Sequence, residues 1–212
     1  MMVELGQIDR PEAGSFADKR KLYCVASIYS LEDAPDEYKN LVQQYWDQAV
    51  DQIGKIEAAG KIKKIFCEII TKADDGSPAV LSRMNERLQE VIKKKTEEGG
   101  VLVPIEDDDI LGPFTDWSNC LRVVFTHSVF EKILDLFTAV AEKRLQHMID
   151  VIDKNLLEAE AGLLILKNED RAKLQFPKDI EVFLITPPSY DDIMRWLRDW
   201  MTKRAEEKKT ES

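Results

Sequence analysis

The sequence predicts a single α/β domain in which a mainly parallel sheet of about five strands is flanked by helices. Short apolar runs of strand type alternate with longer segments of helical apolar periodicity through the first half of the chain. This alternation is typical of right-handed crossovers between parallel strands. The chain of 212 residues, with 44% hydrophobic content, is also long enough to build one full core.

Five apolar runs predict the strands of this sheet. They cover residues 22–29, 62–71, 101–105, 162–166 and 181–185. Helices are predicted between the first three runs, over residues 35–59 and 78–98. The second helix has the strongest start signal in the chain, because Ser77 can cap its first turn and Pro78 suits that turn.

The pattern changes after the third strand, where two helical segments follow one another directly. The first covers about residues 108–125, and the second is a long helix over residues 128–157. We place the domain at residues 21–203. Before it we expect a loosely ordered N-terminal arm over residues 1–20, and after it a charged tail over residues 204–212.

A final amphipathic helix begins at Ser189 and places Trp196 and Trp200 one turn apart. An aromatic stripe of this kind packs against its own sheet or docks against a second subunit, since tryptophan is favoured in interface cores. The second alternative predicts a homodimer through this helix.

Net charge and hydropathy limit the classes of partner. The formal net charge of -10 and the pI of about 4.9 argue against nucleic acid and against anionic membrane surfaces. We found neither an apolar stretch of about 18 to 20 residues nor the blocks of a signal peptide, so we expect no membrane association and a cytoplasmic location. The three cysteines are far apart and form no CxxC pair, as expected in a reducing compartment.

Two charged residues occupy positions where the pattern predicts burial. Glu68 interrupts the apolar run of the second strand, and Arg144 lies on the apolar stripe of the long helix. Because a buried unpaired charge costs several kcal/mol or more, each needs a partner. We predict that they form a bidentate pair beside Tyr29, giving a candidate binding pocket; the alternative is that each finds a separate partner or reaches solvent.

The acidic run Glu106-Asp107-Asp108-Asp109 follows the third strand. Carboxylates at the end of a parallel strand can bind a divalent metal, which makes Glu106, Asp107 and Asp109 weak candidate ligands. The same residues also suit a solvated helix start, where negative charge is favourable. The sequence lacks HExxH, GxSxG, P-loop and GxGxxG motifs, so we predict no cofactor and identify no catalytic residue.

The chain resembles the TraB/TIKI-type, pheromone-shutdown-like family over roughly residues 21–186. The resemblance rests on Ala26-Ser27-Ile28-Tyr29, on Glu68, on Arg144 and on the strand at residues 161–166. It implies metal-assisted hydrolysis. Tyr29 nevertheless stands where that family places its first histidine, and Lys167-Asn168-Glu169-Asp170 supplies no second one.

Together these features predict a non-catalytic binding or interaction module, related to a hydrolase-like family that has lost its metal-binding histidines. The alternative is a metal-assisted hydrolase with a carboxylate-based site around Glu68 and Arg144, in which the arginine holds an anionic substrate group and a divalent metal is the cofactor.

Overall fold

A computed structural model describes residues 19–29, 34–74 and 76–210 of the chain. Its centre is a five-stranded sheet of order β3-β2-β4-β1-β5 in which every neighbouring pair is parallel. The strands are β1 (Arg20–Ala26), β2 (Ile62–Cys67), β3 (Val101–Pro104), β4 (Ala161–Leu166) and β5 (Ile180–Ile185). The predicted fold class is therefore confirmed.

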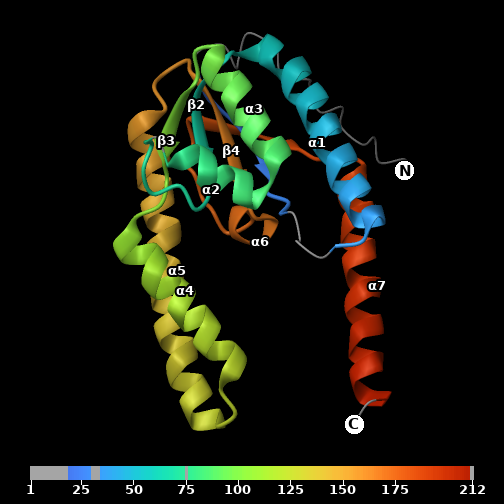
Figure 1. Ribbon diagram of the computed structural model, residues 1–212. Coiled ribbons are helices and arrows are strands. Elements are labelled where there is room, and N and C mark those ends of the chain that lie inside the picture. Colours follow the sequence, from blue (N-terminus) through green and yellow to red (C-terminus); the bar gives the residue numbers. More distant parts are fainter. Residues whose placement is uncertain (1–18, 30–33, 75, 211–212) are drawn as a thin grey trace, which may run out of the picture.

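The strands are apolar because both faces of the sheet are covered. Every residue of β4 is buried, and in β1 only Arg20 is not. On one face lie α1 (Asp36–Ile56), the short 3-10 helix η2 (Glu57–Ala59), α2 (Ser77–Met84), α3 (Glu86–Glu97) and α7 (Ser189–Thr210). Figure 1 shows α1 and α3 lying in front of the sheet, with α7 continuing beyond α1.

The single helix predicted over residues 78–98 is in fact two helices. Asn85 has extended backbone angles (φ -170°, ψ 126°), and its side chain caps α3 by accepting from the amides of Arg87 and Leu88. The predicted cap at Ser77 is wrong, since its hydroxyl donates to the Lys72 carbonyl (2.7 Å). Ser77 therefore stabilises the turn before α2, and the capping asparagine at residue 85 was the signal for the break.

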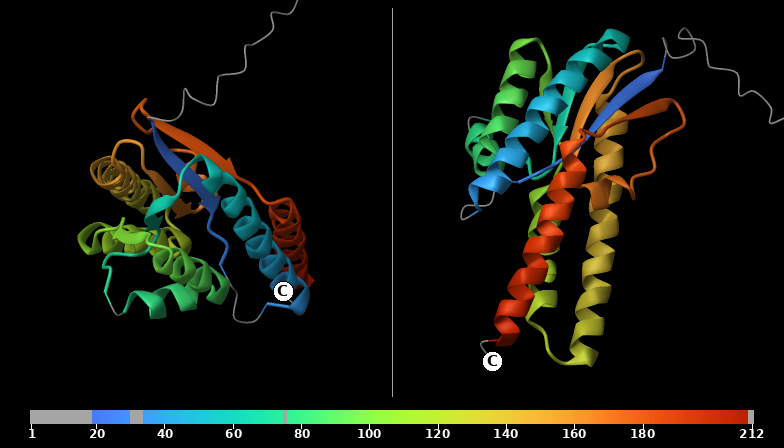
Figure 2. Two further views of the ribbon diagram at one scale, coloured as in Figure 1. Left: turned by 90° about the horizontal axis from the view of Figure 1, so that it is seen from above. Right: turned by 90° about the vertical axis from the view of Figure 1, so that its right-hand side faces the viewer.

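The other face of the sheet is covered by the C-terminal part of α5 (His127–Asn155), where Met148 and Ile152 are fully buried. The rest of α5 pairs with α4 (Asp108–Val123) to form the α4–α5 hairpin. This hairpin projects away from the sheet, as Figures 1 and 2 show. A short helix, α6 (Asn168–Arg171), follows β4 on its way to β5.

Helix α7 projects in the same general direction as the hairpin, with a space between the two (Figures 1 and 2). It remains helical to Thr210, so residues 204–210, predicted as part of a charged tail, extend the last helix. Most of the predicted N-terminal arm, residues 1–18, lies outside the described residues, and β1 already begins at Arg20.

Candidate functional site

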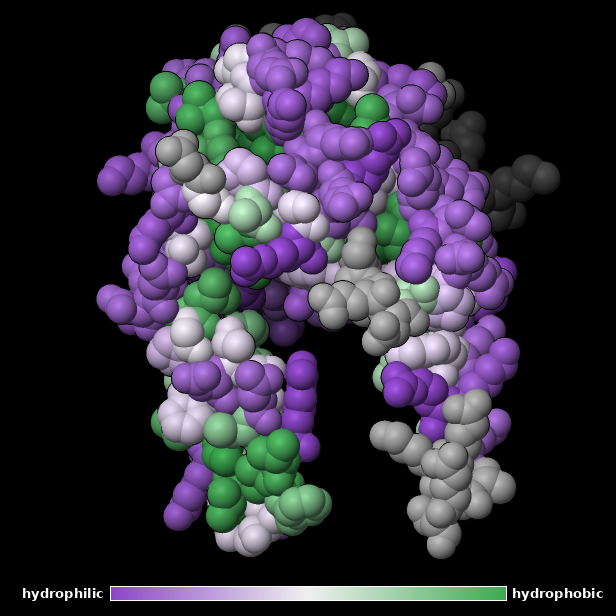
Figure 3. Space-filling model, in the orientation of Figure 1, coloured by the Kyte–Doolittle hydropathy of each residue, from purple (hydrophilic) through white to green (hydrophobic). Residues whose placement is uncertain are grey.

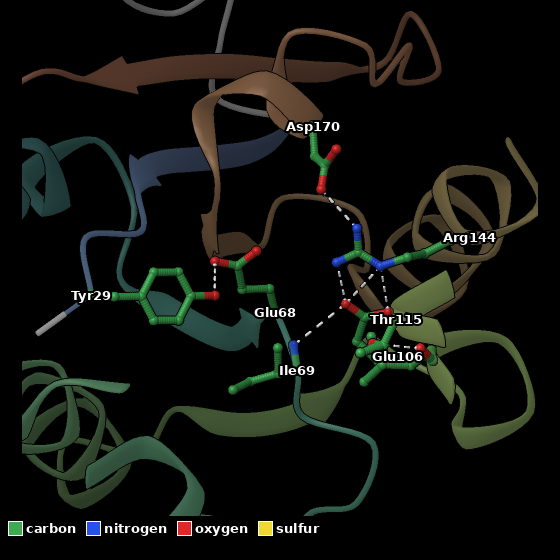
Figure 4. A network of polar contacts seen from close by, with 8 residues as sticks. Tyr29, Glu68, Ile69, Glu106, Thr115, Arg144 and Asp170 are labelled. Carbon is green, nitrogen blue, oxygen red and sulfur yellow. Dashed lines mark hydrogen bonds and ion pairs between the residues drawn. The ribbon is translucent and has the colours of Figure 1, made fainter. Parts of the chain in front are cut away.

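The carboxyl ends of the strands carry two groups of polar side chains that are buried or partly buried, drawn in Figure 4. The first, which we call the arginine cluster, consists of Arg144 from α5, Glu106 after β3 and Asp170 in α6. The second is a pair formed by Tyr29 after β1 and Glu68 after β2. In open α/β sheets this edge is where ligands bind, so both groups are candidates for function.

In the arginine cluster, Glu106 and Asp170 bind the guanidinium from two sides. Nε of Arg144 donates to both oxygens of Glu106 (2.9 and 3.0 Å), Nη2 also contacts Glu106, and Nη1 donates to Asp170 (2.7 Å). The guanidinium also lies 4.6 Å from the centre of the Phe114 ring in α4. Burial lowers the pKa of Arg144, but the two carboxylates raise it by more, so the arginine stays charged.

The Tyr29 hydroxyl donates to the Glu68 carboxylate at 2.5 Å, and Glu68 is only 1% exposed. Burial raises the pKa of Glu68, although the Tyr29 hydroxyl and the nearby Lys167 ammonium oppose this shift. Burial and the neighbouring carboxylate also raise the pKa of Tyr29. Among the described residues Glu68 has no ion-pair partner at contact distance, and the Lys167 ammonium lies over the Tyr29 ring, 5.0 Å from its centre.

A strained turn separates the two groups. Ile69, which follows Glu68 directly, has a φ of 63°, an outlier for a β-branched residue. Its amide donates to Glu106 (3.4 Å), and the Ile70 carbonyl accepts from the amides of Ile105 and Glu106. Backbone strain of this kind persists only where surrounding contacts impose it. Here these hydrogen bonds hold the turn against Glu106, which precedes the hairpin.

The predicted pairing of Glu68 with Arg144 is wrong, and the alternative of separate partners is correct. Within the described residues the two side chains share no hydrogen bond or ion pair (Figure 4). Tyr29 and Glu68 do meet, as two of the three predicted pocket residues. Arg144 pairs with Glu106, which lies between β3 and the hairpin that contains Arg144. Sequence reasoning missed this role of Glu106 because it treated the acidic run as one unit.

The acidic run divides between three roles. Glu106 turns inward to Arg144, Asp107 caps α4 by accepting from the Asp109 amide (2.8 Å), and Asp108 pairs with Lys72 (3.2 Å). The helix-start interpretation therefore fits Asp107 and Asp108. Across the described ranges, no three histidine, cysteine, aspartate or glutamate side chains are grouped so that they could hold a metal ion.

The tryptophans of α7 are half-buried within the chain. Trp196 packs on Tyr38 of α1 (ring centroids 4.8 Å apart), donates to Glu37 (3.0 Å) and stacks on Trp200. The apolar stripe of α7 is therefore used inside the molecule, but its tryptophan packs on helix α1 and not, as the first alternative had predicted, on the sheet. A homodimer through α7 stays a prediction.

Within the described residues, six of the eleven exposed large apolar side chains lie toward the end of the α4–α5 hairpin. Phe125, in the connection between the two helices, is fully exposed, and Val123 is 68% exposed. We call the exposed apolar side chains here the hairpin tip: Val123, Phe125, Val129, Phe130, Leu134 and Leu136. Figure 3 shows hydrophobic surface at the end of this projection. Sequence reasoning missed this site because it assigned the apolar stripe of the long helix to the core.

Comparisons with protein-family models, with curated proteins and with solved structures found no match to this chain. The resemblance to the TraB/TIKI-type family therefore stays a prediction. Among the helices of the described residues, none has the length and apolar character needed to cross a membrane.

Proposed function

We propose that this chain is a non-catalytic interaction module that binds another protein through its hairpin tip. One observation carries the proposal: six large apolar side chains are exposed together at the end of a projecting helical hairpin. Contiguous apolar patches larger than a few hundred Å² are rare on monomeric proteins and mark interaction sites, because exposing them to water is unfavourable.

The base of the hairpin supports a docking role. The arginine cluster connects α5 to the segment before α4 and to α6, so buried ion pairs fix both helices against the sheet. A binding surface is most effective when rigid elements hold it in place, because less conformational entropy is then lost on association.

No specific observation favours the alternative of a metal-assisted hydrolase around Glu68 and Arg144. To hold a substrate anion, Arg144 would have to weaken its contacts with Glu106 or Asp170, since Nε, Nη1 and Nη2 each contact one of them. Removing one partner from a buried ion pair leaves an uncompensated charge and is costly.

Site-specific photo-crosslinking in the cells that produce the protein tests the proposal. A photoreactive amino acid replaces Phe125 in one variant and Leu157 in the matched control. Leu157 is also exposed (59%) but follows the other end of α5. We expect protein adducts from position 125 that disappear when Phe130→Glu is added. Equal adducts from positions 125 and 157 would refute the proposal.

A further inference from the structure

Helix α5 carries an apolar stripe that is too wide for helix α4, its neighbour in the hairpin, to cover completely. Phe137 lies near the middle of this stripe and packs on Phe114 of α4, with ring centroids 5.2 Å apart. At 3.6 residues per turn the stripe covers an arc of about 160°. Its two edges carry exposed side chains, with Val129 and Leu136 on one side and Phe130 and Leu134 on the other. A helix with so wide a stripe needs a second neighbour, as each helix of a four-helix bundle has.

The charge of the hairpin tip suits a second copy of the same chain. Residues 117–141 contain two basic side chains, Arg122 and Lys132, and two acidic ones, Glu131 and Asp135, so their net charge is zero. The whole chain carries -10. Two copies that meet through their tips therefore bring neutral surfaces together and keep their acidic sheet domains apart, which limits repulsion.

The dimensions of the hairpin set an upper limit on the area of such a contact. The outer part of α5, residues 127–143, is roughly 25 Å long at a rise of about 1.5 Å per residue. Two helices packed side by side present a face about 20 Å wide. The face is therefore roughly 500 Å² on each copy and about 1,000 Å² on both, which reaches the lower bound of about 1,000 Å² for a specific interface.

We infer that the hairpin tip binds the hairpin tip of a second copy, so that the two α4–α5 hairpins form an intermolecular four-helix bundle. This inference rests on the proposed function and names its partner. The contact is isologous, with Phe130 and Leu134 of each copy covered by the same face of the other. The phenyl ring of Phe125, which is fully exposed in the described part of the chain, becomes buried at the end of the bundle.

Sedimentation velocity of the full chain between about 1 and 100 μM tests the inference. We expect the mass to approach twice 24.4 kDa as the concentration rises. Phe130→Glu and Leu134→Glu each weaken the dimer at least tenfold. Met201→Glu, on α7 at a side chain that is 65% exposed, is the matched control and leaves the dimer unchanged. Circular dichroism and thermal melting show that each variant is folded.

Mixing a Phe130→Glu variant with a Phe130→Lys variant supplies a second readout. Because the proposed contact is short and buries Phe130 of both copies in one face, the two opposite charges lie close together in the mixed dimer, whereas two like charges repel in each variant alone, so the mixture should form more dimer than either variant. A monomeric wild-type chain at 100 μM, or a dimer broken by Met201→Glu and not by Phe130→Glu, overturns the inference. Crosslinks from position 125 to a different protein would also overturn it while leaving the proposed function intact.

Discussion

At the base of the hairpin, the guanidinium of Arg144 is buried and held by two carboxylates, whereas at the tip the ring of Phe125 is fully exposed. The two ends thus reverse the usual placement of charged and apolar side chains. Among the described residues, Arg144 and Glu106 at the base pair with each other, whereas at the tip Val123 and Phe125 are mostly uncovered and the other apolar side chains are only partly covered. The difference indicates that the base serves stability and the tip serves association.

The largest effect should come from breaking the base. Arg144→Met leaves the Glu106 carboxylate, which is 1% exposed, without its cation, so we expect a loss of about 3 to 5 kcal/mol in the free energy of unfolding. The double variant Glu106→Leu/Arg144→Met removes both buried charges and should lose much less, because Asp170, the remaining carboxylate, is partly exposed to solvent. Urea denaturation of both variants measures this, and a single-variant loss below about 1 kcal/mol would show that the cluster contributes little.

The neighbouring Tyr29–Glu68 pair should make the stability of the protein depend on pH. A carboxyl group with a raised pKa in the folded state binds more protons there than when unfolded. Its contribution to stability is therefore greatest below the unfolded pKa of about 4.3 and is lost as the pH rises through the folded pKa.

Glu68→Gln keeps an acceptor for Tyr29 but removes this titration. Its stability relative to the wild type should therefore increase with pH across that window, by at most about 1.4 kcal/mol for each unit of pKa difference. Thermal unfolding between pH 4 and 8 measures the trend. A constant difference over this range would mean that Glu68 does not titrate differently in the folded protein.

A smaller effect is expected where the hairpin begins. Asp107 caps α4, so Asp107→Ala should cost about 1 kcal/mol, while Asp107→Asn keeps a capping oxygen and should cost less. Chemical denaturation compares the two variants. Equal losses would assign the effect to charge and not to the cap.

The smallest effect on the folded monomer should come from the tip. Phe125→Ser removes a ring that is fully exposed, so monomer stability at low protein concentration should change by less than about 0.5 kcal/mol. A larger loss would mean that Phe125 packs within its own chain, and the contrast between base and tip would then disappear.

The sheet was predictable because its strands are short, apolar and separated by helical periodicity, as β1, β2 and β4 show. The break at Asn85 was missed because helical periodicity continues across it, although an asparagine is a good cap. The local pattern of apolar residues therefore predicted the strands correctly but concealed the break between α2 and α3.

The candidate site was only partly predictable. Burial of Glu68 and Arg144 followed from the apolar positions around them, but their partners did not, because periodicity gives the face of an element and not its distance from other elements. The partners depend on the strained turn at Ile69 and on the strand order, which bring Glu106 to Arg144 and Tyr29 to Glu68. The hairpin tip was missed for a similar reason, since the sequence pattern of an apolar stripe is the same whether the stripe is buried or exposed.

The position of β1 in the sheet constrains how the chain matures on the ribosome. Its neighbours are β4 and β5, and Lys21 pairs with Ala161 and Glu181, so β1 has no strand partner until most of the chain has been synthesised. At about 5 to 20 residues per second, translation takes seconds to cover this separation. The hairpin, whose contacts are local, emerges before β4 and can form first. Its apolar tip is then exposed while β1 is still unpaired, so we expect the nascent chain to expose hydrophobic surface before the sheet closes.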